Sequence, residues 1–186
     1  MESAPPAYLG GYYHWQPELW LPAFRKSFKM DHSVLDAENL NICRTIEECH
    51  CSVGVHIRRG DMTVELPVYG KPVSVDYFLR SIAFFTGKFT DCVFYLFSDE
   101  PNWIRENLFP ISGIADDRLN IVDINGSDKG YMDLFLISRC THQITSKGTM
   151  GKYGALLNDN RGKIVVLRDD ESEYPYKSLF HNPIFL

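Results

Sequence analysis

The stretch "CSVGVHIRRGD", residues 51–61, decides the fold that we expect for this chain. It begins as an apolar strand, and it then carries His56, Arg58, Arg59 and Asp61. Such charge is typical of the point at which a buried strand of a parallel sheet ends and faces a crevice. Because side chains alternate along a strand, His56 and Arg58 should share one face of it.

Strands and helices alternate along the rest of the chain. The run "CVFYLFS" (92–98) is continuously apolar, which is typical of a strand buried on both faces. We expect strands at residues 51–57, 92–98, 119–124, 142–146 and 163–167, and helices at 16–30, 36–50, 74–89, 100–109, 127–140 and 150–158. This alternation predicts an α/β fold, a Rossmann-like parallel sheet of about five strands with helices on both faces. Residues 163–167 should form the last strand, and the tail from Asp169 is polar and aromatic.

The same pattern divides the chain. Residues 1–48 form an aromatic and helical lead-in, and residues 49–186 form the Rossmann-like domain. Asp36 and Ser74 stand where the N-caps of two helices should lie, and the second of these helices should close near Gly87.

Composition and charge exclude several classes of protein. With 45% hydrophobic and 23% charged residues the chain is an ordinary globular protein. Its net charge of −5 argues against nonspecific binding to nucleic acid or to an anionic membrane surface. No apolar run reaches the ~18 residues of a membrane span. The start "MESAPPAYLGG" lacks the apolar core of a secretory leader, so we expect a cytoplasmic protein.

The five cysteines are odd in number and irregular in spacing, which predicts reduced thiols rather than a disulfide framework. Cys43, Cys49, His50 and Cys51 are residues of the types that bind zinc. No second pair stands at ligand spacing, however, and Cys51 opens a strand. We therefore expect no metal site.

Arg58 and Arg59 point to an anionic ligand. The planar fork of donors in arginine suits phosphate oxygens, and two adjacent arginines suit a diphosphate. The alternative is that both form surface ion pairs, with Asp61 and with Glu65.

Polar residues also follow other expected strands. Ser98 and Asp99 either cap the next helix or accept hydrogen bonds from a ribose or a base. "TSKGTMGKYG" (145–154) is a small, Gly-rich turn before a helix, where backbone amides favour phosphate, although a routine helix cap gives the same pattern. The residues expected to contact the anion there are Ser146, Gly148 and Thr149.

These segments resemble glycosyltransferase family 11, the α-1,2-fucosyltransferases. The likeness runs from about Tyr8 to Leu167 and is carried by "VGVHIRRGD", "SVDYF", "YLFSDEPNW" and "DLFLISRCTHQI". "H-x-R-R-G-D" followed by "F-S-D-[DE]-x-x-W" at this spacing is fairly specific. The resemblance implies the C-terminal, donor-binding half of a glycosyltransferase B fold, with Arg58 as a ligand of the GDP-fucose diphosphate.

The resemblance also implies a reaction, the inverting transfer of fucose from GDP-fucose to a galactoside hydroxyl of an oligosaccharide acceptor. The departing GDP gains negative charge, which Arg58, supported by Arg59 and the turn at 146–151, would stabilise. Because arginine takes the place of a metal at the diphosphate, we expect no metal and no cofactor. The candidates for the base that the acceptor hydroxyl needs are His56, Asp61 and Glu65.

Two departures from the family pattern affect this interpretation. Where the family has "N-S-[ST]-F-S-W-W-[GSA]-A", this chain reads "KGTMGKYGA" (147–155), and the family's "GGLGNQMFQY"-like opening is not found in it. We therefore expect a donor-binding half that by itself transfers fucose slowly or not at all, and that docks with another domain or with a second copy. The expected docking patch consists of Tyr12, Tyr13, Trp15 and Trp20. A stand-alone GDP- or GDP-sugar-binding module and a non-nucleotide interaction domain remain open alternatives.

Overall fold

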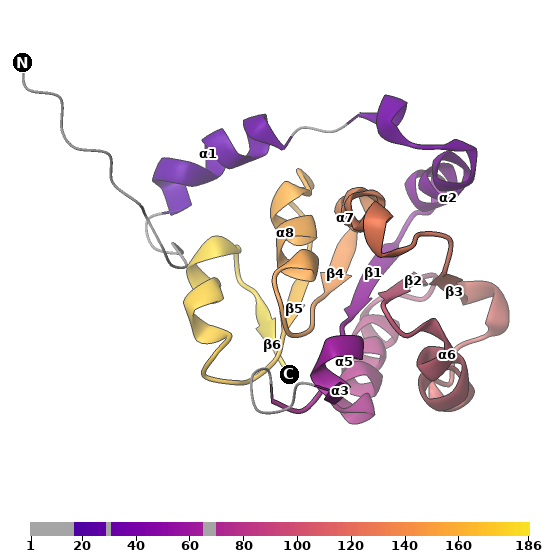
Figure 1. Ribbon diagram of the computed structural model, residues 1–186. Helices are drawn as coiled ribbons and strands as arrows, with labels where there is room; N and C mark the ends of the chain where they lie inside the picture. Colours follow the sequence, from indigo (N-terminus) through magenta and orange to yellow (C-terminus); the bar gives the residue numbers. More distant parts are fainter. Residues whose placement is uncertain (1–16, 29–30, 65–69) are drawn as a thin grey trace, which may run out of the picture.

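A computed structural model describes residues 17–28, 31–64 and 70–186 of the chain. At its centre lies one sheet with the strand order β3-β2-β1-β4-β5-β6, in which every neighbouring pair of strands is parallel (Figure 1). The strands are β1 (Ser52–Ile57), β2 (Val93–Ser98), β3 (Leu119–Val122), β4 (His142–Ile144), β5 (Val165–Leu167) and β6 (Ile184–Phe185). The expected Rossmann-like parallel sheet is confirmed, and its strand order switches between β1 and β4.

The sheet has one strand more than the sequence predicts. At its edge Ile184 pairs with Val166 of β5, and Phe185 pairs with Leu167. The expectation that residues 163–167 form the last strand is therefore wrong. A strand of two residues is too short to show alternation, and pairing with β5 rather than local sequence builds it.

Helices cover both faces of the sheet. They are α1 (Pro17–Ser27), α2 (Ala37–Glu48), α3 (Gly60–Val64), α5 (Val75–Lys88), α6 (Pro101–Trp103), α7 (Gly130–Arg139) and α8 (Met150–Leu157). Asp36 caps α2 as expected, since its carboxylate accepts the N–H of Asn39. Ser74 stands at the N-cap of α5, but its side chain makes no cap bond. Across the described ranges, no helix has both the length and the apolar character that a bilayer crossing requires.

The helix expected at 100–109 is regular only at its start. After α6 the chain continues as a π-helical turn, Ile104–Leu108, and then as a 3₁₀ turn, Phe109–Ile111. Ile104 and Leu108 are both fully buried beneath the sheet, so packing rather than helix propensity decides this segment.

Alternation along β1 divides the core into two layers. Val53, Val55 and Ile57 pack in one cluster with residues of α5. On the other side, Gly54 lies so close to α7 that a Cβ atom would stand 3.1 Å from Cys140 Sγ. His56 faces the same side and lies against α8, which confirms the two-residue period of this strand.

The amino-terminal helix α1 packs on the far edge of the fold. Trp20 and Phe24 contact the core cluster that contains Leu156 of α8 and Leu167 of β5. Trp20 is half-buried and contributes to packing within the domain, and its part in the expected docking patch stays a prediction. The other three residues of that patch lie outside the described residues, and they are Tyr12, Tyr13 and Trp15.

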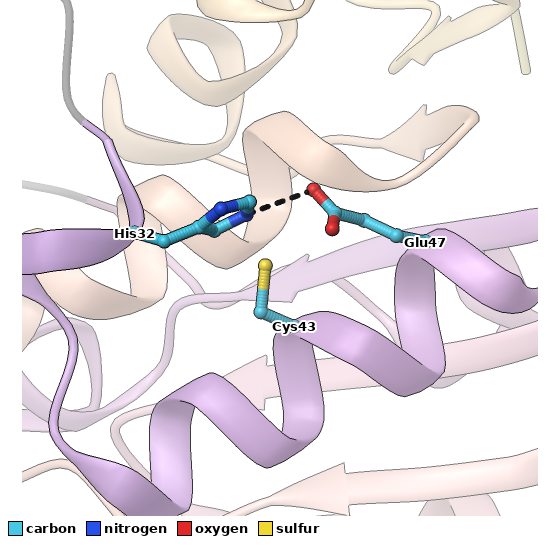
Figure 2. Close-up of side chains that lie close together, drawn as sticks. All are labelled: His32, Cys43 and Glu47. Atoms are coloured by element: carbon cyan, nitrogen blue, oxygen red, sulfur yellow. Dashed lines mark hydrogen bonds and ion pairs between the residues drawn. The ribbon is translucent and has the colours of Figure 1, made fainter.

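Helix α2 belongs to the core as well. Cys43 and Ile46 are buried in the cluster that covers the second face of the sheet, together with residues of α7. On one flank of α2, Cys43 and Glu47 lie beside His32, which comes from the preceding 3₁₀ turn His32–Val34 (Figure 2). Helices α1 and α2 thus supply part of the core, and the division at residue 48 stays a prediction.

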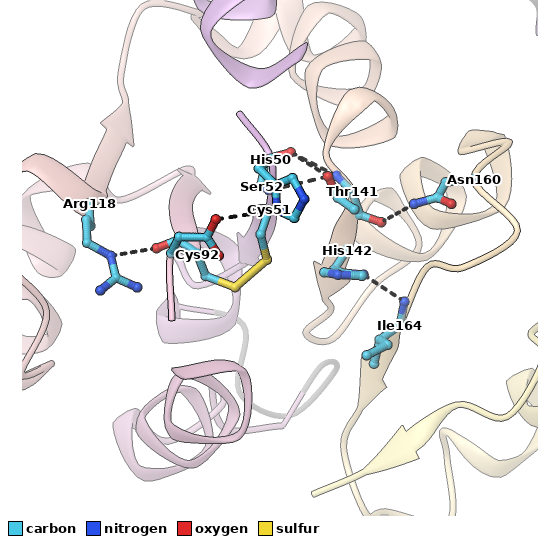
Figure 3. Close-up of a disulfide and its surroundings, with 10 residues drawn as sticks. His50, Cys51, Ser52, Cys92, Arg118, Thr141, His142, Asn160 and Ile164 are labelled. Carbon is cyan, nitrogen blue, oxygen red and sulfur yellow. Dashed lines mark hydrogen bonds and ion pairs between the residues drawn. A yellow bond between two sulfur atoms is a disulfide. The ribbon is translucent and has the colours of Figure 1, made fainter. Parts of the chain in front are cut away.

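Cys51 and Cys92 form a disulfide at the starts of β1 and β2 (Figure 3). Ser52 lies opposite Val93 in the parallel register, so the two preceding residues are neighbours, with Cα atoms 4.7 Å apart. The expectation of reduced thiols is therefore wrong for this pair. The two cysteines stand 41 positions apart in sequence, and only the strand register brings them together. The cysteines that stay free are Cys43, Cys49 and Cys140.

Candidate functional site

A cavity of about 530 Å³ opens at the carboxyl ends of β1, β2 and β3, beside the first turns of α7 and α8. Open α/β sheets bind ligands at this position, and the volume suits a small molecule. We call it the strand-end cavity. It is lined by His56, Arg58, Asp61, Phe97, Ser98, Asp99, Pro101, Asp123, Asn125, Gly126, Ser127, Gly130, Asp133, Thr149 and Met150. The structure thus brings together most of the site residues that the sequence predicts. Arg59, Ser146 and Gly148 do not line the cavity.

Arg58 is held in place by Asp61. Its Nε donates to Asp61 Oδ1 at 3.1 Å, and its Nη2 forms an ion pair with Asp61 Oδ2. The arginine lowers the pKa of Asp61, so this carboxylate is ionised at neutral pH. The ion pair that sequence analysis offered as an alternative is therefore present, and both of its members line the cavity.

The turn before α8 packs directly against Arg58. Gly148 has a φ of +85°, and a Cβ atom there would stand 2.7 Å from Arg58 Nη1. Ser146 Oγ accepts the backbone N–H of Arg58 at 3.2 Å. Ser146 and Gly148, which were expected to contact an anion, thus contact Arg58 instead. Thr149 lines the cavity.

Arg59 turns away from the cavity. Its guanidinium lies 3.8 Å from the centroid of the Trp103 ring, and its Nε donates to Glu100 Oε2 at 3.2 Å. The two adjacent arginines therefore have different surroundings, and only Arg58 reaches the space where a ligand fits. Glu65, the partner that the sequence offered for an ion pair, lies outside the described residues.

Asp99 fixes the turn that carries both arginines. Its Oδ1 accepts the N–H of Arg59 and its Oδ2 accepts the N–H of Gly60, each at 2.9 Å. Ser98 Oγ accepts the N–H of Glu100 at 3.0 Å. Both side chains line the cavity, but their hydrogen bonds shape the protein backbone.

His56 is buried at the floor of the cavity. Its Nδ1 lies 3.2 Å from Ser146 Oγ, and a Cβ on Gly151 would stand 2.8 Å from its own Cβ. Burial, with Lys152 and Arg58 nearby, lowers the pKa of His56 to about 3. The imidazole is therefore neutral at physiological pH, and it is a weak acceptor of a full proton.

A hydrogen-bonded chain that the sequence did not predict forms the opposite wall. Asn125 Nδ2 donates to Asp133 Oδ1 at 2.7 Å and to Asn39 Oδ1 at 2.8 Å, so that α2, the loop after β3 and α7 are connected. Burial raises the pKa of Asp133 to about 6. The sequence signal was a single carboxylate on an apolar helix, which also fits a simple cap or pair.

Lys152 anchors the turn before α8 from beneath. Its buried Nζ donates to Ser146 O at 2.9 Å and to Gly148 O at 2.8 Å, and it pairs with Glu173 Oε2 at 2.9 Å. Glu173 also pairs with Arg168 at 2.9 Å. This lysine stands within the segment where the chain departs from the family pattern, so the departure supplies an internal support for the turn.

The carboxylates of the strand-end cavity already have protein partners. Asp61 is paired with Arg58, Asp99 with two backbone amides, Asp123 with Arg105, and Asp133 with Asn125. Over the described ranges, the one cluster with metal-ligand geometry lies elsewhere, at His32, Cys43 and Glu47. The cavity therefore offers a ligand the guanidinium of Arg58 and four carboxylates that are each partly satisfied by the protein.

A second cavity of about 650 Å³ lies between α1, the loop after α8 and the C-terminal tail. Its walls include Arg25, Lys163 and His181. None of the strand-end motifs contributes to it, so we place the site in the smaller cavity.

A family model described as glycosyl transferase family 11 matches residues 12–182. The alpha-1,2-colitosyltransferase of Escherichia coli is 29% identical over 152 residues, which cover 78% of this chain and 50% of that protein. Galactoside alpha-(1,2)-fucosyltransferase 2 of Rattus norvegicus is 34% identical over 109 residues, which cover 56% and 29%. The chain spans about half the length of these curated relatives, or less.

Among solved structures, one of NodZ alpha-1,6-fucosyltransferase soaked with GDP-fucose matches 66% of this chain and 42% of its own, with a TM-score of 0.40 and 17% identity. A likeness at this level carries no argument about fold details or ligands.

Proposed function

This chain belongs to glycosyltransferase family 11, and we propose that it binds the donor in a fucosyltransferase that moves fucose from GDP-fucose to a galactoside hydroxyl with inversion. The observation that carries the proposal is the position of Arg58, whose guanidinium reaches a cavity of about 530 Å³ at the strand ends. Such a group binds and stabilises a diphosphate leaving group.

The surroundings of Arg58 support this role because they hold it before any ligand arrives. Asp61 holds its guanidinium and Ser146 holds its backbone N–H. Gly148 leaves the space beside it. Donors that are already oriented need little reorganisation as charge develops in the transition state. Thr149 and Met150, at the start of α8, line the same cavity, and the amino end of a helix favours an anion.

The opposite wall suits the base of the nucleotide. Asp133 offers a carboxylate oxygen beside the amide of Asn125, in a half-buried setting. We propose that this carboxylate accepts hydrogen bonds from the N–H groups of guanine. Cytosine and uracil do not present the same set of N–H donors. Asp99, which sequence analysis proposed for such contacts, is occupied by the backbone of the turn.

Of the candidate bases within the described residues, Asp61 is the better placed. It is ionised and half-exposed at the cavity, so it can accept a hydrogen bond from an acceptor hydroxyl while it orients Arg58. His56 has a pKa of about 3, which makes it a weak base at neutral pH. We propose that His56 instead supports the floor through Ser146.

A second candidate function is a GDP- or GDP-sugar-binding module without transfer. The observation in its favour is coverage, since the chain spans about half the length of the curated relatives it matches. A transferase must also position the acceptor hydroxyl against the donor, and positioning accounts for much of the rate.

Calorimetric titration with GDP, ADP and UDP, joined to a transfer assay with GDP-fucose and galactosides, separates these functions. Preferential GDP binding with transfer supports the transferase, and GDP binding without transfer supports the module. Failure to bind any of the three nucleotides contradicts both and leaves the interaction domain. We expect EDTA to leave GDP affinity unchanged, because Arg58 takes the place of a metal. Loss of affinity that Mg²⁺ or Mn²⁺ restores would contradict this.

A further inference from the structure

Three side chains of metal-ligating types converge on the flank of α2, apart from the strand-end cavity. His32 comes from the 3₁₀ turn before the helix, and Cys43 and Glu47 stand four residues apart on the helix itself. Their ligand atoms all lie within 4.8 Å of one another. Figure 2 shows the thiol of Cys43 directed toward the space between the imidazole and the carboxylate.

We propose that His32, Cys43 and Glu47 bind one Zn²⁺ ion, with a water molecule as the fourth ligand. Zinc favours this mixture of imidazole, thiolate and carboxylate, and sites with three protein ligands and an open position are common. His32 Nε2 and Glu47 Oε1 already lie 3.1 Å apart. Two zinc bonds of about 2.0–2.1 Å at a tetrahedral angle would hold these atoms about 3.3 Å apart.

The groups around the cluster orient its ligands. Arg139 donates to Glu47 Oε1 at 2.6 Å, and the ring of His32 packs edge-on against Phe135 at 5.9 Å. Glu47 Oε1 accepts from Arg139 and lies beside His32, and its second lone pair can bind a metal while Arg139 keeps its bond. Carboxylate ligands of metals are themselves commonly hydrogen-bonded in this way.

Two of the three ligands are accessible to solvent, so an ion can reach the cluster. The side chain of His32 is 50% exposed and that of Glu47 is 29% exposed, whereas Cys43 lies beneath them and is fully buried. On binding, the His32–Glu47 hydrogen bond is replaced by two bonds to the metal. The Cys43 thiol loses its proton to solvent and binds as the thiolate. The ion would tie the turn before α2 to the helix.

Titration of the chain with Co²⁺, with the Cys51–Cys92 disulfide intact, tests this proposal, because a thiolate bound to Co²⁺ gives a charge-transfer absorption in the near ultraviolet. We expect this absorption to saturate at one equivalent and to disappear when Zn²⁺ displaces the cobalt. Cys43→Ser should abolish it, while Cys49→Ser, a variant of a free and half-buried cysteine, should leave it unchanged.

His32→Ala provides a second arm at a position whose side chain is 50% exposed. It should weaken Co²⁺ binding by about tenfold or more, whereas His181→Ala should have no effect. The proposal is overturned if the wild-type chain shows no thiolate absorption. It is also overturned if the absorption survives Cys43→Ser, or if His32→Ala binds as tightly as wild type. In each of those cases the cluster is an ion pair between His32, Glu47 and Arg139 above a buried thiol.

Discussion

Gly148 makes room for Arg58: a Cβ atom at position 148 would stand 2.7 Å from Nη1 of the arginine. Two segments separated by 90 residues of sequence are therefore fitted to each other at one contact. The turn before α8 therefore contributes to the site by holding Arg58 in position. Its backbone amides can also bind a ligand.

Gly148→Ala should weaken GDP binding by tenfold or more, because the methyl group displaces the guanidinium. It should also lower the free energy of unfolding by about 1–3 kcal/mol, since φ is +85° there. Gly113→Ala is the matched control, with φ +69° and no atom within 4 Å of the added Cβ. It should cost similar stability and leave GDP affinity unchanged. Calorimetry and thermal unfolding measure both quantities, and equal GDP affinities for the two variants would contradict the fit.

Asp133→Asn should make the fold more stable while it weakens GDP binding. Burial raises the pKa of Asp133 to about 6, so the folded chain holds this proton more tightly than the unfolded chain does. Stability therefore falls as pH rises through the interval up to about 6, and the ionised group costs as much as about 3 kcal/mol above it. Asparagine removes this cost, and chemical denaturation at pH 7 and pH 5 measures the gain.

The same variant should lose GDP affinity by about tenfold to hundredfold, because the amide removes the negative charge and replaces one of the two acceptor oxygens for guanine N–H groups with a donor. In the wild-type chain, GDP affinity should fall as pH drops through about 6, where Asp133 gains its proton. Asp123→Asn serves as the control, since Asp123 lines the same cavity but pairs at the surface with Arg105. A loss of GDP affinity in Asp123→Asn as large as in Asp133→Asn would remove the special role of Asp133.

Replacement of both Cys51 and Cys92 by alanine should lower the free energy of unfolding by about 2–4 kcal/mol, because the disulfide closes a loop of 41 residues. GDP affinity should not change, since the bond lies at the starts of β1 and β2 and the cavity lies at their ends. Urea unfolding with and without a reductant measures the effect. If reduction changes the wild-type midpoint no more than that of the double variant, the disulfide does not stabilise the chain.

The parts of the site that the sequence predicted follow from local pattern. A strand that ends in charge, with a two-residue period, places His56 and Arg58 on one side, and the turn at Ser146 follows the neighbouring strand β4. The sheet order of an α/β fold then brings the two ends together. These positions follow from the local pattern and from the strand order of the fold class alone.

The parts that it did not predict depend on distant contacts. Nothing next to Arg59 in sequence shows that Trp103 offers a ring for its guanidinium. The pair Asn39–Asn125 joins residues 86 positions apart, and the disulfide depends on strand register. The strand Ile184–Phe185 exists because β5 leaves an open edge. Each of these features is decided by packing, which a single sequence does not encode locally.

We propose that Arg58, and not Arg59, binds the diphosphate of the donor. Paired calorimetric titrations of Arg58→Ala and Arg59→Ala with GDP test it most directly. Arg58→Ala should lose about 1.5–3 kcal/mol of binding free energy, which is roughly 10- to 150-fold in affinity. Arg59→Ala should bind GDP nearly as wild type does, while it loses stability through the contacts with Trp103 and Glu100. Equal and small losses of GDP affinity in the two variants would contradict the account.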